Sequence, residues 1–214
     1  MLLGEIITLV HDTIRRPDKE ALIDQRILQA VRATHAIGPF PLDRVEWIIP
    51  TSDISFNTTD PAIGHFDQPR DVRLPEIVQP LDASCAPVGD PLKLIEISEV
   101  IKCKTLNGNA AGTAYRVDGG ISFHAHAEVT AISLTGITHR PAWDVVYNAN
   151  GTTRAMTDST ITLYTDWLLD YLPLAVVDNA LGFALASVGE AALSRTHLAL
   201  VAETHIPVLD LLVK

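Results

Sequence analysis

The chain has 214 residues, of which 47% are hydrophobic, enough for one domain, or one domain with an inserted module, around a sizeable core. Its 26 acidic and 16 basic residues give a net charge of −10 at pH 7, and no basic stripe is visible, so a protein that grips nucleic acid is disfavoured. Cys85 and Cys103 form no CxxC pair, which, without a secretory signal, predicts reduced thiols in a cytosolic protein.

Neither a signal peptide nor a membrane span is expected. Glu5 interrupts the apolar N-terminal stretch, which also lacks a positively charged region. The apolar run over residues 168–188 contains Asp170, Asp178 and Asn179, and charged side chains are costly at the centre of a bilayer.

Two amphipathic helices are predicted at the N-terminal end. Apolar residues recur at helical spacing over residues 2–14 and again over residues 18–37. The turn between the helices is expected around Pro17, with Asp18 as the N-cap of the second helix. The second helix should stop before Gly38, which leaves the two helices packed antiparallel.

A β-rich insertion is predicted over residues 40–160, where the apolar period falls to two and Pro and Gly recur. Asp118, Gly119 and Gly120 form a strong hairpin signal, because these residues tolerate positive φ. The other expected elements are strands and one short helix, at residues 45–49, 92–97, 121–129 and around Leu134, and from Ser98 through Cys103. Residues 50–70 and 146–160 are rich in Thr, Asn, Asp and Gly and are expected to form long loops.

Helical spacing returns at the C-terminal end. One helix is predicted from Pro173 to Gly189 and another over residues 191–204, after which Pro207 separates an apolar tail. The chain is therefore predicted to be an α+β protein with three parts: a helical bundle formed by the N- and C-terminal helices (residues 1–39 and 161–205), a central antiparallel β-rich insertion with long loops (40–160), and a C-terminal tail (206–214).

Three potential metal ligands share one face of the predicted strand over residues 121–129. They are His124, His126 and Glu128, and two imidazoles with a carboxylate can bind zinc or iron. A polar strand face that meets solvent or another subunit gives the same pattern, and nothing demands a further ligand, although His139 and Asp144 could complete a site. We therefore expect no metal and no other cofactor.

No catalytic motif is apparent. The chain has no G-x-S-x-G elbow, no P-loop and no GxGxxG, and Gly119 and Gly120 belong to a turn rather than to a phosphate-binding loop. We expect a protein that is not an enzyme.

A packing joint is predicted where Trp167 and Leu168 precede the helix that starts at Pro173. Proline suits the first turn of a helix, and Trp167 is expected to pack under that turn and fix the angle at which the chain enters it. Ala180 and Ala184, with Gly182 between them, let a neighbouring helix approach closely. The helix is expected to lie either in an ordinary core or at a seam between subunits.

Three blocks of sequence resemble, in order, the head-to-tail connector or adaptor proteins of tailed bacteriophages, particularly the short-tailed kind. The block TDWLLDYLPLAVVDNAL over residues 165–181 is similar to the family motif TNWLL…PD.YLYGAL.EA. The opening blocks (RPD at residues 16–18, ILQAVRATHA at 27–36, PLDRVE at 41–46) and the hairpin YRVDGG at 115–120 also resemble the family pattern. Asp166 stands where the family usually has Asn.

The resemblance implies a structural virion protein made in the host cytoplasm. It would form a homo-oligomeric, dodecameric ring that binds the portal protein and joins it to tail nozzle, tube or fibre proteins at the head-tail interface. The ring would leave a channel through which genomic DNA passes during genome ejection without specific binding, and an acidic chain suits such a channel. No membrane is expected among the partners.

The apolar tail is expected to insert into a groove of the portal. The side chains proposed to bind there are all apolar: Ile206, Val208, Leu209, Leu211 and Leu212. The tail could instead fold back on its own bundle. Two other classes of protein also stay open, namely another phage ring such as a tail terminator or stopper, and a metal-dependent enzyme using His124, His126 and Glu128.

Overall fold

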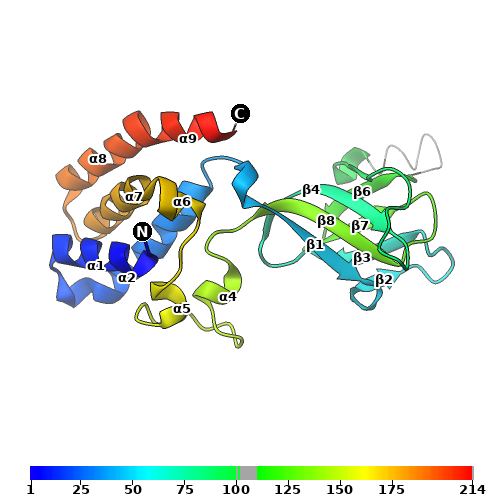
Figure 1. The fold of residues 1–214 in the computed structure, drawn as a ribbon, viewed down its shortest axis with the longest axis horizontal. Coiled ribbons are helices and arrows are strands. Elements are labelled where there is room, and N and C mark those ends of the chain that lie inside the picture. The colour runs from blue at the N-terminus through cyan, green and yellow to red at the C-terminus, as the bar shows by residue number, and fades with distance from the viewer. Residues whose placement is uncertain (100, 102–109, 214) are drawn as a thin grey trace. The chain divides into compact units, whose positions relative to one another are not determined.

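The computed structural model describes residues 1–99, 101 and 110–213. The chain divides into two compact units, a helical unit of Met1–Asp43 with His139–Lys214, and a β unit of Arg44–Thr138 (Figure 1). The predicted α+β class is confirmed, with the N- and C-terminal helices packed together and the strands between them in sequence. The β unit is shorter than the insertion expected over residues 40–160, because residues 139–160 contribute Val146, Tyr147 and Met156 to the helical core.

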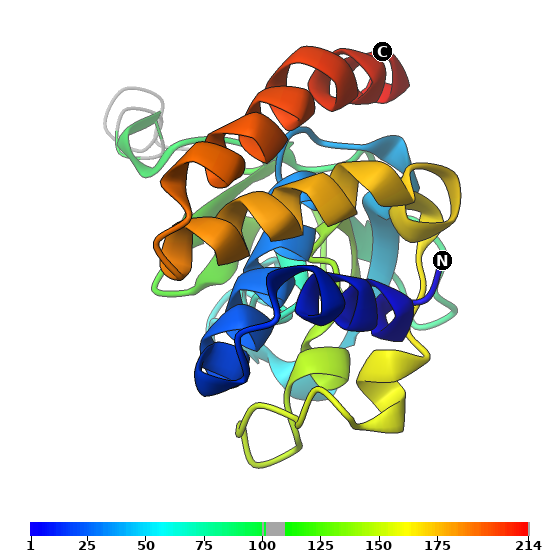
Figure 2. The ribbon, with the colours of Figure 1, turned by 90° about the vertical axis from the view of Figure 1, so that its left-hand side faces the viewer.

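The helical unit is built from helices of both ends of the chain. In chain order its elements are α1 (Leu3–Ile14), a 3-10 turn (Pro17–Lys19), α2 (Glu20–His35), a 3-10 turn (Pro41–Asp43), α4 (Trp143–Val146), α5 (Ser159–Thr162), α6 (Trp167–Tyr171), α7 (Pro173–Ser187), α8 (Ala191–Leu200), a π-helical segment (Val201–His205) and α9 (Ile206–Val213). Figure 2 shows α7 between the N-terminal helices on one side and α8 and α9 on the other, and α7 contacts α1, α2 and α8. In the part of the chain that the structure describes, no helix has the length and apolar character needed to cross a membrane.

The periodic apolar residues of α1 and α2 explain their packing. Leu3, Ile6 and Val10 of α1 are fully buried, as are Ile23 and Ile27 of α2. These side chains lie on one face of each helix and meet the apolar face of α7, so burial of the amphipathic faces stabilises the unit.

The start of α2 differs from the prediction. Asp18 does not cap the helix but lies in the 3-10 turn, where its carboxylate accepts hydrogen bonds from Arg16 at 2.9 and 3.0 Å. Helix α1 ends at Arg15, whose φ of 51° is left-handed, and α2 begins at Glu20. The Asp18 carboxylate is thus bound by the Arg16 side chain and does not cap α2.

Helices α7 and α8 pack closely at Gly182. A Cβ atom on Gly182 would lie 2.6 Å from Leu198 Cδ2, and the Ser194 hydroxyl donates to the Gly182 carbonyl oxygen at 2.8 Å. Ala180 and Ala184 are fully buried in the unit's own core, so in this arrangement they contact no second subunit.

The C-terminal segment is helical rather than a separate tail. Helix α8 continues through the π segment into α9, and the Ile206 N–H donates to the Val201 carbonyl oxygen five residues earlier. Proline lacks an N–H and its ring crowds the preceding turn, and a wider π turn directly before Pro207 accommodates it without ending the helix. Leu209 is fully buried in the helical core, so α9 belongs to the bundle.

The β unit contains two sheets. One has the strand order β1-β8-β4 (Arg44–Pro50, Ala131–Thr138, Val72–Leu81), and the other has the order β2-β3-β7-β6-β5 (Ile54–Phe56, Ile63–Asp67, Gly120–His124, Thr113–Val117, Lys93–Leu94). All neighbouring strands are antiparallel except β5 and β6. The core of the unit includes Phe66, Ile121, Phe123, Ile132 and Leu134.

The predicted strands and loops of this unit agree only in part with the structure. The hairpin turn is present, with φ of 49° at Asp118 and 78° at Gly119, and β1 covers the strand expected at residues 45–49. The long loop expected over residues 50–70 instead contains β2 and β3, and the strand expected at 92–97 is reduced to β5. Of the helix expected from Ser98 through Cys103, residues 98, 99 and 101 are helical and the rest lie outside the described residues.

Candidate functional site

The proposed metal ligands do not form a site. Strand β7 ends at His124, so the period-two alternation that placed His124, His126 and Glu128 on one strand face stops there. His126 and Glu128 lie in the exposed segment that follows. In residues 1–99, 101 and 110–213, no group of three or more His, Cys, Asp or Glu side chains is placed to hold a metal ion.

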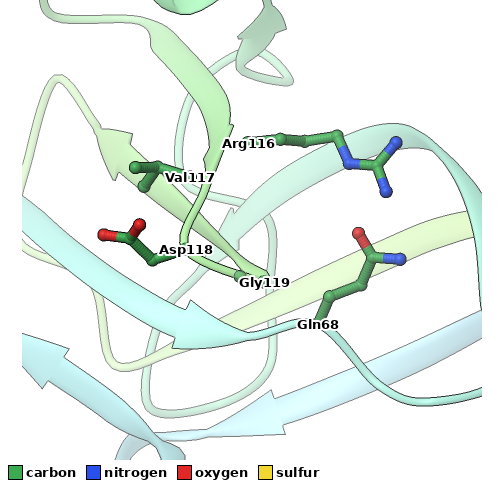
Figure 3. Close-up of a pocket in the computed structure, with 6 residues that line it drawn as sticks. Gln68, Arg116, Val117, Asp118 and Gly119 are labelled. Carbon is green, nitrogen blue, oxygen red and sulfur yellow. The ribbon is translucent and has the colours of Figure 1, made fainter.

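A polar hollow lies at the β6–β7 turn. It has a volume of about 320 Å³ and is lined by Gln68, Arg116, Val117, Asp118 and the glycines of the turn. Figure 3 shows the Arg116 and Gln68 side chains pointing into the same space, while Val117 and Asp118 point away from it. Arg116 and Asp118 are exposed and Gln68 is only half-buried, so the hollow lacks the buried polar groups that usually orient a ligand.

An apolar pocket in the helical unit is the strongest candidate for a functional site. It has a volume of about 350 Å³ and is lined by Leu42, Trp167, Tyr171, Leu172 and Val208. These side chains come from the segment before β1, from α6 and its C-cap, and from α9. Tyr171 is 76% exposed, and Leu42 and Val208 are also exposed. Grouped apolar side chains around a hollow are typical of a surface that binds another protein.

Two exposed carboxylates lie close to pocket residues in the sequence: Asp170 next to Tyr171, and Asp210 two residues after Val208. The Asp170 side chain in α6 is 52% exposed, and its nearest cation is the N-terminal amine of the chain at 3.6 Å. Asp210 in α9 is exposed as well. A partner with basic residues beside an apolar segment would be electrostatically complementary to this surface.

Trp167 links the pocket to the interior of the helical unit. Its indole N–H donates to Asp43 Oδ1 at 2.7 Å, and its ring packs edge-on against His35 and Phe40, with centroid distances of 5.5 and 5.1 Å. Trp167 therefore packs against the end of α2 and the segment before β1, whereas we expected it under the first turn of α7. Pro173 does occupy that first turn.

Asp166 caps α6 and joins a buried ionic cluster. Its Oδ1 accepts the backbone N–H groups of Leu168 and Leu169, both at 3.0 Å, as expected for an N-cap aspartate. Its Oδ2 accepts the Tyr164 hydroxyl at 2.7 Å and lies 3.0 Å from His35 Nε2. Leu168 is fully buried beneath this turn.

The other side of the cluster is formed by residues next to the β unit in sequence. Asp43 immediately precedes β1, and its Oδ2 lies 3.1 Å from His35 Nδ1. Arg140 follows β8 by two residues, and its Nε lies 3.7 Å from Asp43 Oδ1. The side chains of His35, Asp43 and Asp166 are 2%, 0% and 4% exposed, so the interactions are shielded from water.

The environment shifts the proton affinities of three groups. Burial by itself would lower the pKa of His35, but its hydrogen bonds to Asp166 and Asp43 outweigh burial and raise the pKa above its usual value. Burial by itself would raise the pKa of Asp166, but His35, Tyr164 and the capped N–H groups hold it below its usual value. Burial and the neighbouring Asp166 carboxylate raise the pKa of Tyr164 well above its usual range, so this phenol stays protonated.

The tail side chains that were proposed to bind the portal differ in their exposure to solvent. Val208 and Leu211 are exposed, Ile206 is half-buried, and Leu209 is fully buried in the core. Leu212 lies in α9, but its side chain is outside the described part of the chain. Among the members of this group whose side chains the structure describes, Val208 alone lines the apolar pocket.

Sequence reasoning found Trp167 but missed its partners. His35 and Asp43 were both within sequence blocks that resemble the adaptor family, yet nothing in the spacing showed that they meet Asp166, more than a hundred residues later in the chain. The one available signal was Asp166 itself, a carboxylate at a position where the family usually has an amide.

Neither a comparison with models of protein families nor one with curated proteins found a match to this sequence.

Proposed function

We propose that the chain is a structural virion protein, the head-to-tail adaptor of a tailed bacteriophage, and that it forms a ring on the portal. The resemblance of three ordered sequence blocks to that family suggests this function. One observation from the structure supports it most directly: the block over residues 165–181 contributes three of the five side chains that line the exposed apolar pocket, Trp167, Tyr171 and Leu172.

The pocket suits an assembly partner better than a small substrate. It is lined by apolar side chains, and its rim residues Leu42, Tyr171 and Val208 are exposed. Of the carboxylates next to these residues in sequence, Asp43 and Asp166 are buried and already hydrogen-bonded, and Asp170 is 52% exposed. A portal segment with an apolar anchor and neighbouring Lys or Arg side chains would fill the pocket and pair with the exposed carboxylate. The proposed role is non-enzymatic.

Burial of Leu209 limits which residues of the predicted tail can contact a portal. Leu209 could reach a portal groove only by leaving the core, which would expose a leucine that is now fully buried. We propose that α9 stays on the bundle and that Val208, beside Tyr171 and Leu42, contacts the portal. Leu211, in the same helix, is 71% exposed.

A ring would place many acidic copies around one channel. A formal charge of −10 on each subunit repels the DNA backbone, so the genome would pass without being held. In a cyclic ring, two different faces of each subunit contact the neighbouring copies. The apolar pocket can bind the portal while these other faces form the ring.

The binding role of the pocket can be tested with Val208→Glu. A carboxylate at the rim of an apolar pocket should weaken retention of the protein on a purified candidate portal by at least tenfold, about 1.4 kcal/mol or more. Leu193→Glu is the matched control, because Leu193 is an exposed leucine in the same unit that does not line the pocket. If circular dichroism shows both variants folded and the portal retains them equally, the pocket does not bind the portal.

A further inference from the structure

Both ring nitrogens of His35 face carboxylate oxygens in the interior of the helical unit. Nδ1 lies 3.1 Å from Asp43 Oδ2 and Nε2 lies 3.0 Å from Asp166 Oδ2, while the imidazole itself is 2% exposed. An ionised carboxylate only accepts hydrogen bonds, and a neutral imidazole has a single N–H to donate. A neutral His35 would thus turn a lone pair toward one carboxylate oxygen with no proton between them.

The remaining oxygen atoms of the two carboxylates are already occupied by donors. Asp43 Oδ1 accepts the Trp167 indole N–H, and Asp166 Oδ1 accepts the N–H groups of Leu168 and Leu169. These oxygens cannot move toward other donors without breaking a cap or the tryptophan bond. His35 can therefore donate a hydrogen bond to both carboxylates only when both of its ring nitrogens carry a proton.

The same proton balances the charges of His35, Asp43, Asp166 and Arg140. Asp43 and Asp166 contribute two negative charges, and a protonated His35 and Arg140 contribute two positive charges. The Tyr164 hydroxyl, which donates to Asp166, is uncharged. Loss of the proton leaves one uncompensated negative charge in a buried site, which is strongly unfavourable.

Arg32 lies one turn before His35 on α2, but its guanidinium lies over the Tyr147 ring, 5.6 Å from the centroid. The charged groups of the cluster include Asp43, Asp166 and Arg140, from the segments before β1, before α6 and after β8.

We propose that the cluster of His35, Asp43, Asp166 and Arg140 is a proton-binding site whose occupancy fixes Trp167 and, through it, the apolar pocket. When the proton is present, Asp43 is held against both His35 and the indole N–H, and α6 is capped by Asp166. When the proton leaves, the two carboxylates lose their shared donor, and the segment before β1 and the start of α6 separate. The pocket then loses the fixed position of Trp167, whatever partner it binds.

The direction of the pH effect follows from the raised pKa of His35. A histidine whose pKa is higher in the folded than in the unfolded state stabilises the fold fully below its unfolded value, and this contribution is lost as the pH rises through the folded value. The contacts of His35 with Asp43 and Asp166 are therefore expected to hold below the usual pKa of histidine and to weaken as the pH rises through the raised pKa of His35.

Nuclear magnetic resonance of the full-length protein tests the proposal without any variant. At pH 6.5, where an unperturbed histidine is about half protonated, the ¹⁵N shifts of His35 should show both ring nitrogens more than half protonated. On raising the pH, the Trp167 indole N–H resonance should move with the same inflection as His35. A His35 that is mostly neutral at pH 6.5, or a Trp167 resonance that does not respond to the deprotonation of His35, would overturn the proposal.

Asp166→Asn provides a matched variant of almost identical shape. The amide oxygen can keep the N-cap, and its NH₂ group can donate to an unprotonated Nε2, so a neutral His35 is satisfied. We expect the shared inflection to shift to lower pH or to disappear, with the backbone spectrum of a folded protein retained. An inflection at an unchanged pH in the folded variant would show that the carboxylate of Asp166 does not create the proton-binding site.

Discussion

Truncating Leu209 to alanine is expected to destabilise the protein far more than truncating Leu211 in the same helix. Leu209 is fully buried in the core of the helical unit, and Leu211 is 71% exposed. Both lie in α9, two residues apart, and the change in helix propensity is the same for both substitutions. The difference between the variants therefore measures the packing of α9 on the bundle.

The magnitude follows from the volume removed. Leucine to alanine deletes three carbon atoms, which at about 0.8 kcal/mol for each buried methylene amounts to about 2.4 kcal/mol of transfer free energy. A cavity adds to this loss, and buried leucine truncations commonly reach 2–5 kcal/mol. Because neighbouring side chains can fill part of the space, we expect about 2–3 kcal/mol for Leu209→Ala. For Leu211→Ala we expect less than about 0.5 kcal/mol.

Urea unfolding followed by far-ultraviolet circular dichroism measures both variants. With a slope of about 2 kcal/mol/M, the expected loss for Leu209→Ala lowers the midpoint by about 1–1.5 M. Leu211→Ala should unfold close to the unmodified protein. If the two variants unfold at the same urea concentration, α9 is not part of the core and the hypothesis of a free tail that inserts into the portal regains its basis.

Three further changes have definite expected outcomes. Asn179→Ala removes a buried donor to the Thr34 hydroxyl at 3.0 Å and should lower the unfolding free energy by about 1–3 kcal/mol in thermal unfolding; an unchanged midpoint would show that this bond contributes nothing. Gly136→Ala places a Cβ 2.6 Å from the Leu74 carbonyl oxygen, a backbone atom, so a loss of about 1–3 kcal/mol is expected in urea unfolding of the β unit, and a neutral effect would contradict the close strand approach. The lowered pKa of Asp166 gives stability that is present above its unfolded pKa and is lost as the pH falls through the folded value, so Asp166→Asn should show a shallower acid-side decrease in urea midpoint, and an equal decrease would contradict its pairing with His35.

The long helices could be predicted because one face of each is buried. The apolar spacing in α1 and α2 corresponds to Leu3, Ile6, Val10, Ile23 and Ile27, all of which face the core. The same logic located α7 and α8, whose close approach at Gly182 was visible as a run of small residues.

The short strands could not be predicted in the same way. β2 has three residues and β3 has five, too few for an alternating pattern to stand out in a segment rich in Thr, Asn and Asp. β4 contains Pro75 and Pro80 and two register irregularities, which interrupt the period of two. Tertiary pairing with β8 overrides these unfavourable local signals.

Two residues of the candidate pocket, Trp167 and Val208, were singled out from the sequence. Trp167 stood out as a large aromatic side chain before Pro173, but its hydrogen-bond partner Asp43 is far away in the sequence. Likewise, Pro207 was expected to end the helix, but α8, the π-helical segment and α9 are continuous. The π-helical hydrogen bond at Ile206 that allows this has no sequence signature of its own. Contacts between distant segments depend on the packed fold, which residue spacing does not encode.

The mass of the protein, alone and mixed with a candidate portal, tests the adaptor proposal most directly. Native mass spectrometry or light scattering should show a multi-copy, dodecameric ring on the portal, formed whether the free protein is a monomer or an oligomer. A discrete oligomer that ignores the portal would contradict the adaptor role and favour a tail terminator or stopper. A monomer that carries one bound metal ion would contradict both and point to the metal-dependent enzyme.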